Sequence, residues 1–193
     1  MKTYTVDAEP IKAAMLHSAD KDVRYYLNGI YLDADNGRVI GTNGHTAVIV
    51  YDEKVRELST SMIVKISGTV PAKATRAHIV TLDDRHGYLY YDQAKSPVEQ
   101  KGQLVRHFYD VIEGKYPEIE TIKKRFKPEA TPQIVVNGEY MGLAAKTVRA
   151  LRAGAGSGLN LTFSGENDLM RAVGGDQCSH EHEIYIMPMR MDR

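Results

Sequence analysis

The segment from Cys178 to His182 carries residue types that bind metal ions. Cys178, His180 and His182 alternate with other residues, so on an extended strand their side chains would share one face. Thiolate and imidazole groups are common zinc ligands. No second pair of ligands follows at a standard spacing, and a turn before a last strand explains the same residues. We therefore expect no metal ion here.

Two further features invite a catalytic interpretation. The glycine-rich loop Gly154–Gly158 looks like a phosphate-binding loop, but it follows a predicted helix and no Lys-Ser or Lys-Thr pair comes after it. It is better explained as the end of that helix. His45 follows a tight Asn-Gly turn with no nucleophile or acid motif beside it. The residues therefore predict no catalysis and no cofactor.

Composition limits the classes of protein that remain. At 193 residues and 42% apolar content, the chain can bury one substantial core or two small ones. Its 25 basic and 25 acidic residues cancel, which removes bulk charge as an argument for attraction to nucleic acid or membrane. A single cysteine, no signal-peptide pattern and no membrane-length apolar run favour a cytoplasmic globular protein that does not bind membranes.

The first 52 residues have the pattern of a βαβββ unit. A short alternating strand at Tyr4–Val6 precedes a helix, in which Ile11, Ala14 and Met15 recur at helical spacing. Turns rich in Asn, Asp and Gly then separate three strands. These strands are expected at Arg24–Leu32, Arg38–Thr42 and Thr46–Tyr51.

Residues 129–193 repeat this plan and suggest an internal duplication. We expect a strand at Gln133–Val136, a helix from about Glu139 to Arg152, and strands at Leu159–Phe163, Leu169–Val173 and Glu183–Met189.

Residues 53–128 contain strand patterns but no convincing helical one. The segment Ser67–Lys73 stands where the helix of another such unit would be expected. Lys123–Pro128 is predicted to be a basic, proline-ended connector. The chain thus divides into half-units at 1–52, 53–128 and 129–193, in the α+β class. The strands expected in the middle half-unit are Met62–Ile66, His78–Leu82, Tyr88–Tyr91 and Leu104–Ile112.

Four motifs, Arg24–Gly29, Thr42–His45, Gly114–Ile119 and Met187–Arg190, resemble those of one known family. This family is the bacterial sliding clamp, the β subunit of DNA polymerase III, in which they occur in the same order. The resemblance implies a DNA-clamp fold built from βαβββ half-units. That family builds rings from three-domain protomers, whereas this chain has about three half-units, so it resembles a shortened clamp whose oligomeric geometry stays open.

The resemblance also implies a groove for partner peptides. A glutamine would bind backbone groups there, while leucine and aromatic side chains would fill apolar pockets. Thr46 and Thr121 depart from the basic residues that the family usually has, which weakens contacts to acidic groups at the rim. The alternative is that Tyr185, Met187 and Met189 only pack as a terminal strand. The groove residues are expected at Leu27, Thr42, Gly44, His45, Pro117, Ile122, Tyr185, Met187, Pro188, Met189 and Arg190.

The resemblance implies loose, sequence-independent contacts between helices and the phosphates of duplex DNA. Lys146, Arg149 and Arg152 recur at three-residue spacing on the C-terminal helix and are the candidates. A solvated helix face, without DNA, explains the same spacing. Lys123–Lys127 allows the same two interpretations.

These features predict a sliding-clamp-like accessory of DNA replication, a processivity factor without catalysis of its own. Its partners would be a polymerase, a clamp loader or similar proteins with clamp-binding peptides, together with duplex DNA and further copies of the chain. The alternative is a regulatory mimic that sequesters clamp-binding partners without encircling DNA. An enzyme or metalloprotein around Cys178–His182 is a third hypothesis.

Overall fold

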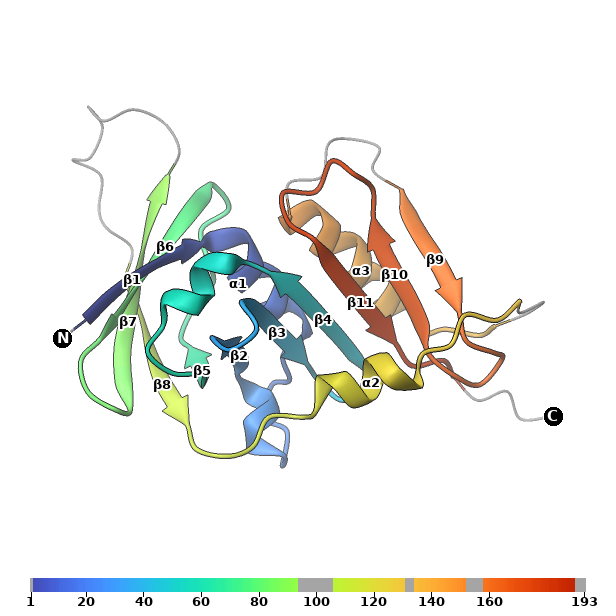
Figure 1. Ribbon diagram of the computed structural model, residues 1–193, viewed down its shortest axis with the longest axis horizontal. Helices are drawn as coiled ribbons and strands as arrows, with labels where there is room; N and C mark the ends of the chain where they lie inside the picture. Colours follow the sequence, from blue (N-terminus) through green and yellow to red (C-terminus); the bar gives the residue numbers. More distant parts are fainter. Residues whose placement is uncertain (1, 94–105, 131–133, 152–157, 190–193) are drawn as a thin grey trace.

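The computed structural model describes residues 2–93, 106–130, 134–151 and 158–189. Its strands form one antiparallel sheet in the order β1-β6-β7-β8-β5-β2-β3-β4-β11-β10-β9 (Figure 1). The predicted α+β class is confirmed. In chain order the elements are β1 (Lys2–Asp7), α1 (Ala8–His17), β2 (Ile30–Asp33), β3 (Arg38–Thr42), β4 (Thr46–Tyr51), β5 (Met62–Ile66), β6 (Ala74–Thr81), β7 (His86–Gln93), β8 (Arg106–Ile112), α2 (Ile119–Arg125), α3 (Gly138–Ala150), β9 (Leu159–Phe163), β10 (Met170–Gly174) and β11 (His182–Ile186).

Helices cover both faces of the central strands. In Figure 1, α2 lies in front of the sheet, and α1 and α3 lie behind it. The side chains of β3 and β4 alternate accordingly: Val39 and Val48 belong to the main core beneath α1, whereas Ile40 and Ile49 face α2. This two-sided burial explains why these strands are almost continuously apolar.

The helix α1 packs closely on β3 because small residues meet there. Ala13 and Ala14 are fully buried, and a Cβ atom on Gly41 would lie 2.0 Å from the carbonyl oxygen of Ala14. Only glycine fits at this point of the strand. The same helix also packs against α3, so α1 joins the beginning of the chain to its last half-unit.

The predicted strand Arg24–Leu32 is wrong over most of its length. Residues Tyr25–Asn28 form a 3-10 helix (η1), and the strand starts only at Ile30. The cause is local. The Asp22 amide donates to the Asn28 side chain at 2.8 Å, and that side chain returns a bond to the Asp22 carbonyl at 2.9 Å. Such side-chain to backbone bonds compete with a strand.

Two predictions near the second half of the chain also need correction. Residues 134–136 are not in a strand, although Val135 accepts a hydrogen bond from the Met189 amide at 2.8 Å; Gln133 lies outside the described residues. The connector predicted at Lys123–Pro128 begins inside α2, which ends at Arg125. The run of basic residues at its end suggested a connector, although Ile119 and Ile122 form an apolar face on this short helix.

The structure has no α-helix between β5 and β6. Residues 53–128, for which no clear helix was predicted, nevertheless contain α2 near their end. A 3-10 helix, η2 (Glu53–Glu57), precedes β5. In the part of the chain that the structure describes, no helix combines the length and apolar character needed to span a membrane.

Candidate functional site

The turn between β3 and β4 is rigid because its polar side chains bond to its own backbone. The Asn43 carboxamide oxygen accepts from the amides of His45 at 2.9 Å and Thr46 at 2.8 Å. The Thr42 hydroxyl donates to the Thr46 carbonyl at 2.7 Å. Gly44 has φ +86°, a conformation that favours glycine. The turn therefore presents His45 at the surface in a fixed position.

The chain that follows β11 lies beside this turn. The Met187 amide donates to the carbonyl of His45 at 2.9 Å, and the His45 ring stacks on Tyr140 with centroids 5.9 Å apart. Met189 bonds back to Val135, and 51% of its surface is exposed. Residues 187–189 thus run between the turn and the segment before α3.

A second apolar cluster lies on the face of the sheet that α2 covers. We call it the outer-face cluster; its fully buried members are Ile40, Ile49, Ile63, Tyr116, Ile119 and Tyr185. Ile122 and Phe126 of the α2 region pack against it, and Phe126 meets Tyr185 edge-on at 5.8 Å. Burial raises the pKa of Tyr185 to about 12, so this phenol stays neutral.

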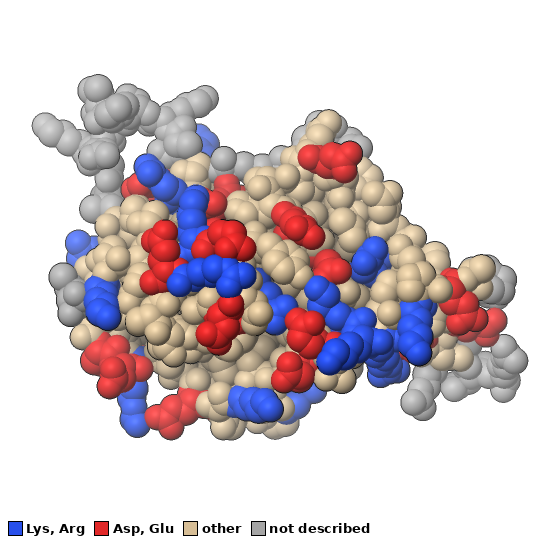
Figure 2. Space-filling view, in the orientation of Figure 1, with Lys and Arg blue, Asp and Glu red and all other residues tan. Residues whose placement is uncertain are grey.

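Charged groups hold α2 on the sheet. The Lys123 ammonium lies 2.8 Å from a Glu183 carboxylate oxygen and 2.7 Å from the Tyr51 hydroxyl. Burial lowers the pKa of Lys123, but its bonds to Glu183 and Tyr51 outweigh this effect and raise it overall. Arg171 lies over the Phe126 ring at 5.4 Å and 3.5 Å from Glu183. Figure 2 shows Lys and Arg side chains gathered around α2 on this face.

The opposite face carries the two long helices and a buried histidine between them. His17 of α1 has no exposed surface; its Nδ1 is 3.0 Å from the Thr46 hydroxyl and its Nε2 is 2.8 Å from the Thr147 hydroxyl. Thr147 donates its own proton to the Leu143 carbonyl at 2.9 Å. It therefore accepts from Nε2–H, while Nδ1 accepts from Thr46. This neutral imidazole joins α1, β4 and α3.

Comparison with solved structures identifies the architecture. Over 98% of its length the chain aligns with a DNA polymerase sliding clamp from Pseudomonas aeruginosa, at a TM-score of 0.61 and 16% identity, covering 66% of that chain. A sliding clamp from Bacillus subtilis aligns with 99% of this chain at a TM-score of 0.59 and 10% identity, and 65% of that clamp is covered. This chain has the sliding-clamp fold. A PCNA2–PCNA3 complex from Sulfolobus tokodaii also matches, over 97% of this chain and 99% of that chain, at a TM-score of 0.52 and 10% identity.

The sequence itself matches no protein-family model and no curated protein. The chain spans slightly less than two thirds of the Pseudomonas and Bacillus clamps that it matches.

Within this clamp fold, the predicted groove residues separate into two groups. Leu27, Thr42 and Tyr185 are buried, with 1%, 4% and 3% of their surfaces exposed. The remainder are at least partly accessible, except Arg190, which lies outside the described residues. The accessible residues are Gly44, His45, Pro117, Ile122, Met187, Pro188 and Met189. The structure brings His45 and Met187 together directly, whereas Ile122 belongs to the outer-face cluster.

The predicted DNA contacts lie on α3. Lys146 and Arg149 are exposed, and the buried residues Ala144, Thr147 and Val148 hold the other side of this helix. Arg152 lies outside the described residues.

The residues considered as zinc ligands have other partners. The His182 ring accepts from the Gly174 amide at 2.9 Å and donates to the His180 carbonyl at 3.0 Å. Cys178 belongs to a turn, since its amide donates to Gly175 at 3.2 Å. A different group, Asp7, Asp52 and His180, has suitable ligand atoms within 4.8 Å of one another.

An ammonium group already balances charge in this second group. Lys54 lies 2.6 Å from an Asp7 oxygen, and the carboxylate of Asp52 accepts from two backbone amides at 3.0 Å. We interpret the group as an ion-paired contact between β1, β4 and the loop before β11.

Sequence reasoning missed Tyr51, Phe126 and Glu183, which fix α2 over the sheet. A helical spacing of Ile119, Ile122 and Phe126 was the available signal.

Proposed function

We propose that this chain is a sliding-clamp-like accessory of DNA replication that binds partner proteins through short peptide segments and performs no catalysis. The observation that carries the proposal is the clamp fold over 98% of the chain. The motifs at Arg24–Gly29, Thr42–His45 and Met187–Arg190 support it from the sequence. The expected partners are a polymerase or loader with a glutamine-leucine-aromatic peptide.

The proposed peptide site uses the accessible residues around the β3–β4 turn. His45, Met187 and Met189 would supply its surface, because methionine adapts to apolar ligands of different shape. The hydrogen bond from Met187 to His45 would fix one wall relative to the other. Buried Leu27 and Thr42 would support the turn from below.

The proposed DNA contact lies on α3 and predicts weak, sequence-independent binding. In a Lys146→Glu/Arg149→Glu variant, duplex affinity should fall because two cations that meet phosphates become anions. The slope of log affinity against log salt should also decrease in magnitude by about 1.8 in that variant. Fluorescence anisotropy with a labelled duplex at several salt concentrations measures both quantities.

A matched double variant, Lys124→Glu/Lys127→Glu, reverses two exposed cations on and just beyond α2. If it weakens duplex binding as much as the α3 variant does, the contact is not specific to α3.

We further propose that the half-units 1–52, 53–128 and 129–193 are the repeating parts of this fold, and that a ring requires several copies. The strand order supports association between copies, because β1 and β9 end the described sheet and leave two edges for pairing. Sedimentation and retention on circular versus linear duplex test the assembly. Association together with selective retention on circles is expected. A monomer in both conditions would leave only the mimic that binds clamp partners without DNA.

A further inference from the structure

A large cavity lies away from the proposed peptide site, beyond the β2–β3 hairpin. Its volume is about 950 Å³, at the upper end of the range for ligand pockets. Five parts of the chain that are far apart in the sequence line it: Lys2 and residues 31–40, 59–63, 81–84 and 109–119. Of the predicted groove residues that the structure describes, only Pro117 contributes. The cavity is therefore separate from the site at His45.

The cavity has an ordered apolar surface. Tyr31 stacks on Tyr116 with ring centroids 5.1 Å apart and planes 17° from parallel. The Tyr116 hydroxyl donates to the Ile40 carbonyl at 3.4 Å, which fixes this ring. Ile112 is partly exposed and Leu82 has 50% of its surface exposed, although both are large apolar residues. These groups can bury an apolar side chain of a ligand.

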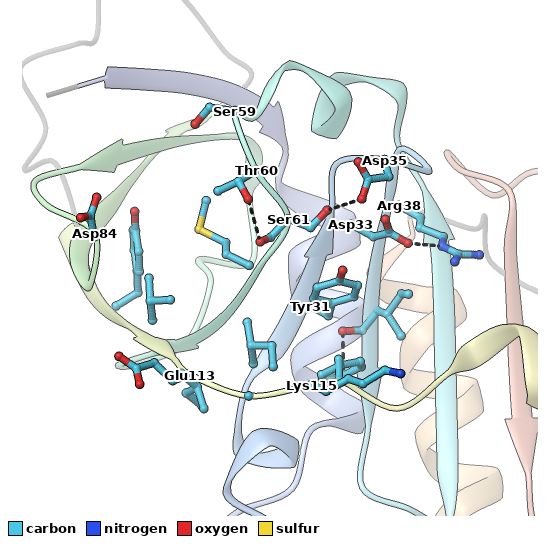
Figure 3. Close-up of a pocket in the computed structure, with 18 of the residues that line it drawn as sticks. Tyr31, Asp33, Asp35, Arg38, Ser59, Thr60, Ser61, Asp84, Glu113 and Lys115 are labelled. Carbon is cyan, nitrogen blue, oxygen red and sulfur yellow. Dashed lines mark hydrogen bonds and ion pairs between the residues drawn. The ribbon is translucent and has the colours of Figure 1, made fainter.

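Acidic groups predominate around this surface. The lining includes six carboxylates, Asp33, Asp35, Asp83, Asp84, Glu113 and Glu118, and three cations, Lys2, Arg38 and Lys115. Figure 3 shows Asp84 and Glu113 on one side of the cavity and Asp35 on the opposite side, with Tyr31 between them.

The buried cation is not available to an anionic ligand. Arg38 already forms two ion pairs, because its guanidinium lies 2.6 Å from a carboxylate oxygen of Asp33 and 2.6 Å from one of Glu120. In the part of the chain that the structure describes, Asp84 and Glu118 have no hydrogen bond or ion pair through their carboxylates. Glu113 is paired with Arg85 at 2.9 Å. The cavity thus combines apolar contact area with a lining in which six carboxylates outnumber three cations.

We propose that this cavity binds a basic, extended peptide segment of a partner protein. An apolar side chain of that segment contacts Tyr31, Leu82 and Ile112, and flanking lysine or arginine residues pair with Asp84 and Glu118. Charge complementarity selects this occupant over an acidic one. The inference rests on the cavity alone, so it can fail or succeed independently of the clamp function.

The probe is a labelled octapeptide, Lys-Arg-Leu-Ser-Phe-Arg-Lys-Ser, titrated into the isotopically labelled full chain. We expect saturable amide shifts at Tyr31, Leu82 and Ile112. A matched peptide with glutamate at every basic position should not bind. Shifts centred on residues 187–189, no saturable shifts, or equal binding of the acidic peptide would overturn the proposal. The same amide shifts are compared in the protein alone at several concentrations. If they change on dilution in the absence of peptide, they report self-association, which would also overturn the proposal.

Charge reversal then tests the assigned contacts. An Asp84→Lys/Glu118→Lys variant should weaken binding at least about tenfold, since two attractive pairs become repulsive. The matched control, Asp176→Lys/Glu181→Lys, makes the same charge change at exposed positions near β11 and should bind within about twofold of the parent. An Asp84→Asn/Glu118→Gln variant, which keeps side-chain size, should show an intermediate loss. Equal effects of the first variant and its control contradict the assignment.

Discussion

Lowering the pH from 6.5 to 4 is expected to destabilise the folded protein by about 3 kcal/mol through His17 alone. Burial lowers the pKa of His17 from 6.5 to about 4. The unfolded chain therefore binds a proton over this range while the folded chain does not, so stability falls as pH falls. Urea unfolding at closely spaced pH values measures the change.

A His17→Leu variant separates this contribution from that of other titrating groups. At pH 8 it should lose about 1–2 kcal/mol, because the Thr46 and Thr147 hydroxyls lose their imidazole partner. Its stability should then decline less than that of the parent between pH 6.5 and 4. Identical profiles for parent and His17→Leu would remove His17 as the acid-sensitive group.

A Gly41→Ala variant is expected to lose about 3 kcal/mol or more of unfolding free energy, because overpacking against backbone leaves no side chain to move aside. The added methyl group would lie 2.0 Å from the Ala14 oxygen, so α1 or β3 must shift. Such a shift would also displace His17 from Thr46. Urea denaturation measures the loss.

Gly142→Ala is the matched control within a helix. Apart from its chain neighbours and the backbone of α3 itself, no heavy atom lies within 4 Å of the position that its Cβ would occupy. The change should be neutral or stabilise by up to about 1 kcal/mol, the helix preference of alanine over glycine. If Gly41→Ala is equally harmless, the close packing of α1 on β3 is not required for stability.

Strands bounded by clear turn signals were predictable from the sequence. β3, β4, β5 and β9 have the expected bounds, because short apolar or alternating runs lie between turn residues. The absence of an α-helix between β5 and β6 was predictable, since Ser67–Lys73 carries no helical period. The helix α2 was not predicted.

Features that depend on long-range contacts were not predictable. The sequence gives no sign that His17 meets Thr147, because their bond joins residues 130 positions apart. Two hydrogen bonds between the Asn28 side chain and the Asp22 backbone favour η1 where a strand was expected. Strand propensities do not include such bonds. Tyr185 was predicted as a groove residue, but only packing reveals that Phe126 lies against its ring.

The large cavity was likewise hidden from sequence reasoning. Its lining comes from five separate parts of the chain, and each part alone has the composition of an ordinary turn or strand end. Only the folded chain brings Asp84 and Glu113 opposite Asp35, as Figure 3 shows.

The central claim is tested most directly by calorimetry with a clamp-binding peptide, a glutamine followed by spaced leucines and an aromatic residue. Burial of two or three large apolar side chains, less the cost of ordering the peptide, corresponds to an affinity on the order of micromolar. Met189→Lys should weaken binding at least about tenfold by placing a charge in the apolar contact. Leu161→Lys, at a 40% exposed position on β9, should bind like the parent. No binding by the parent, or unchanged binding by Met189→Lys, would contradict the proposed partner site.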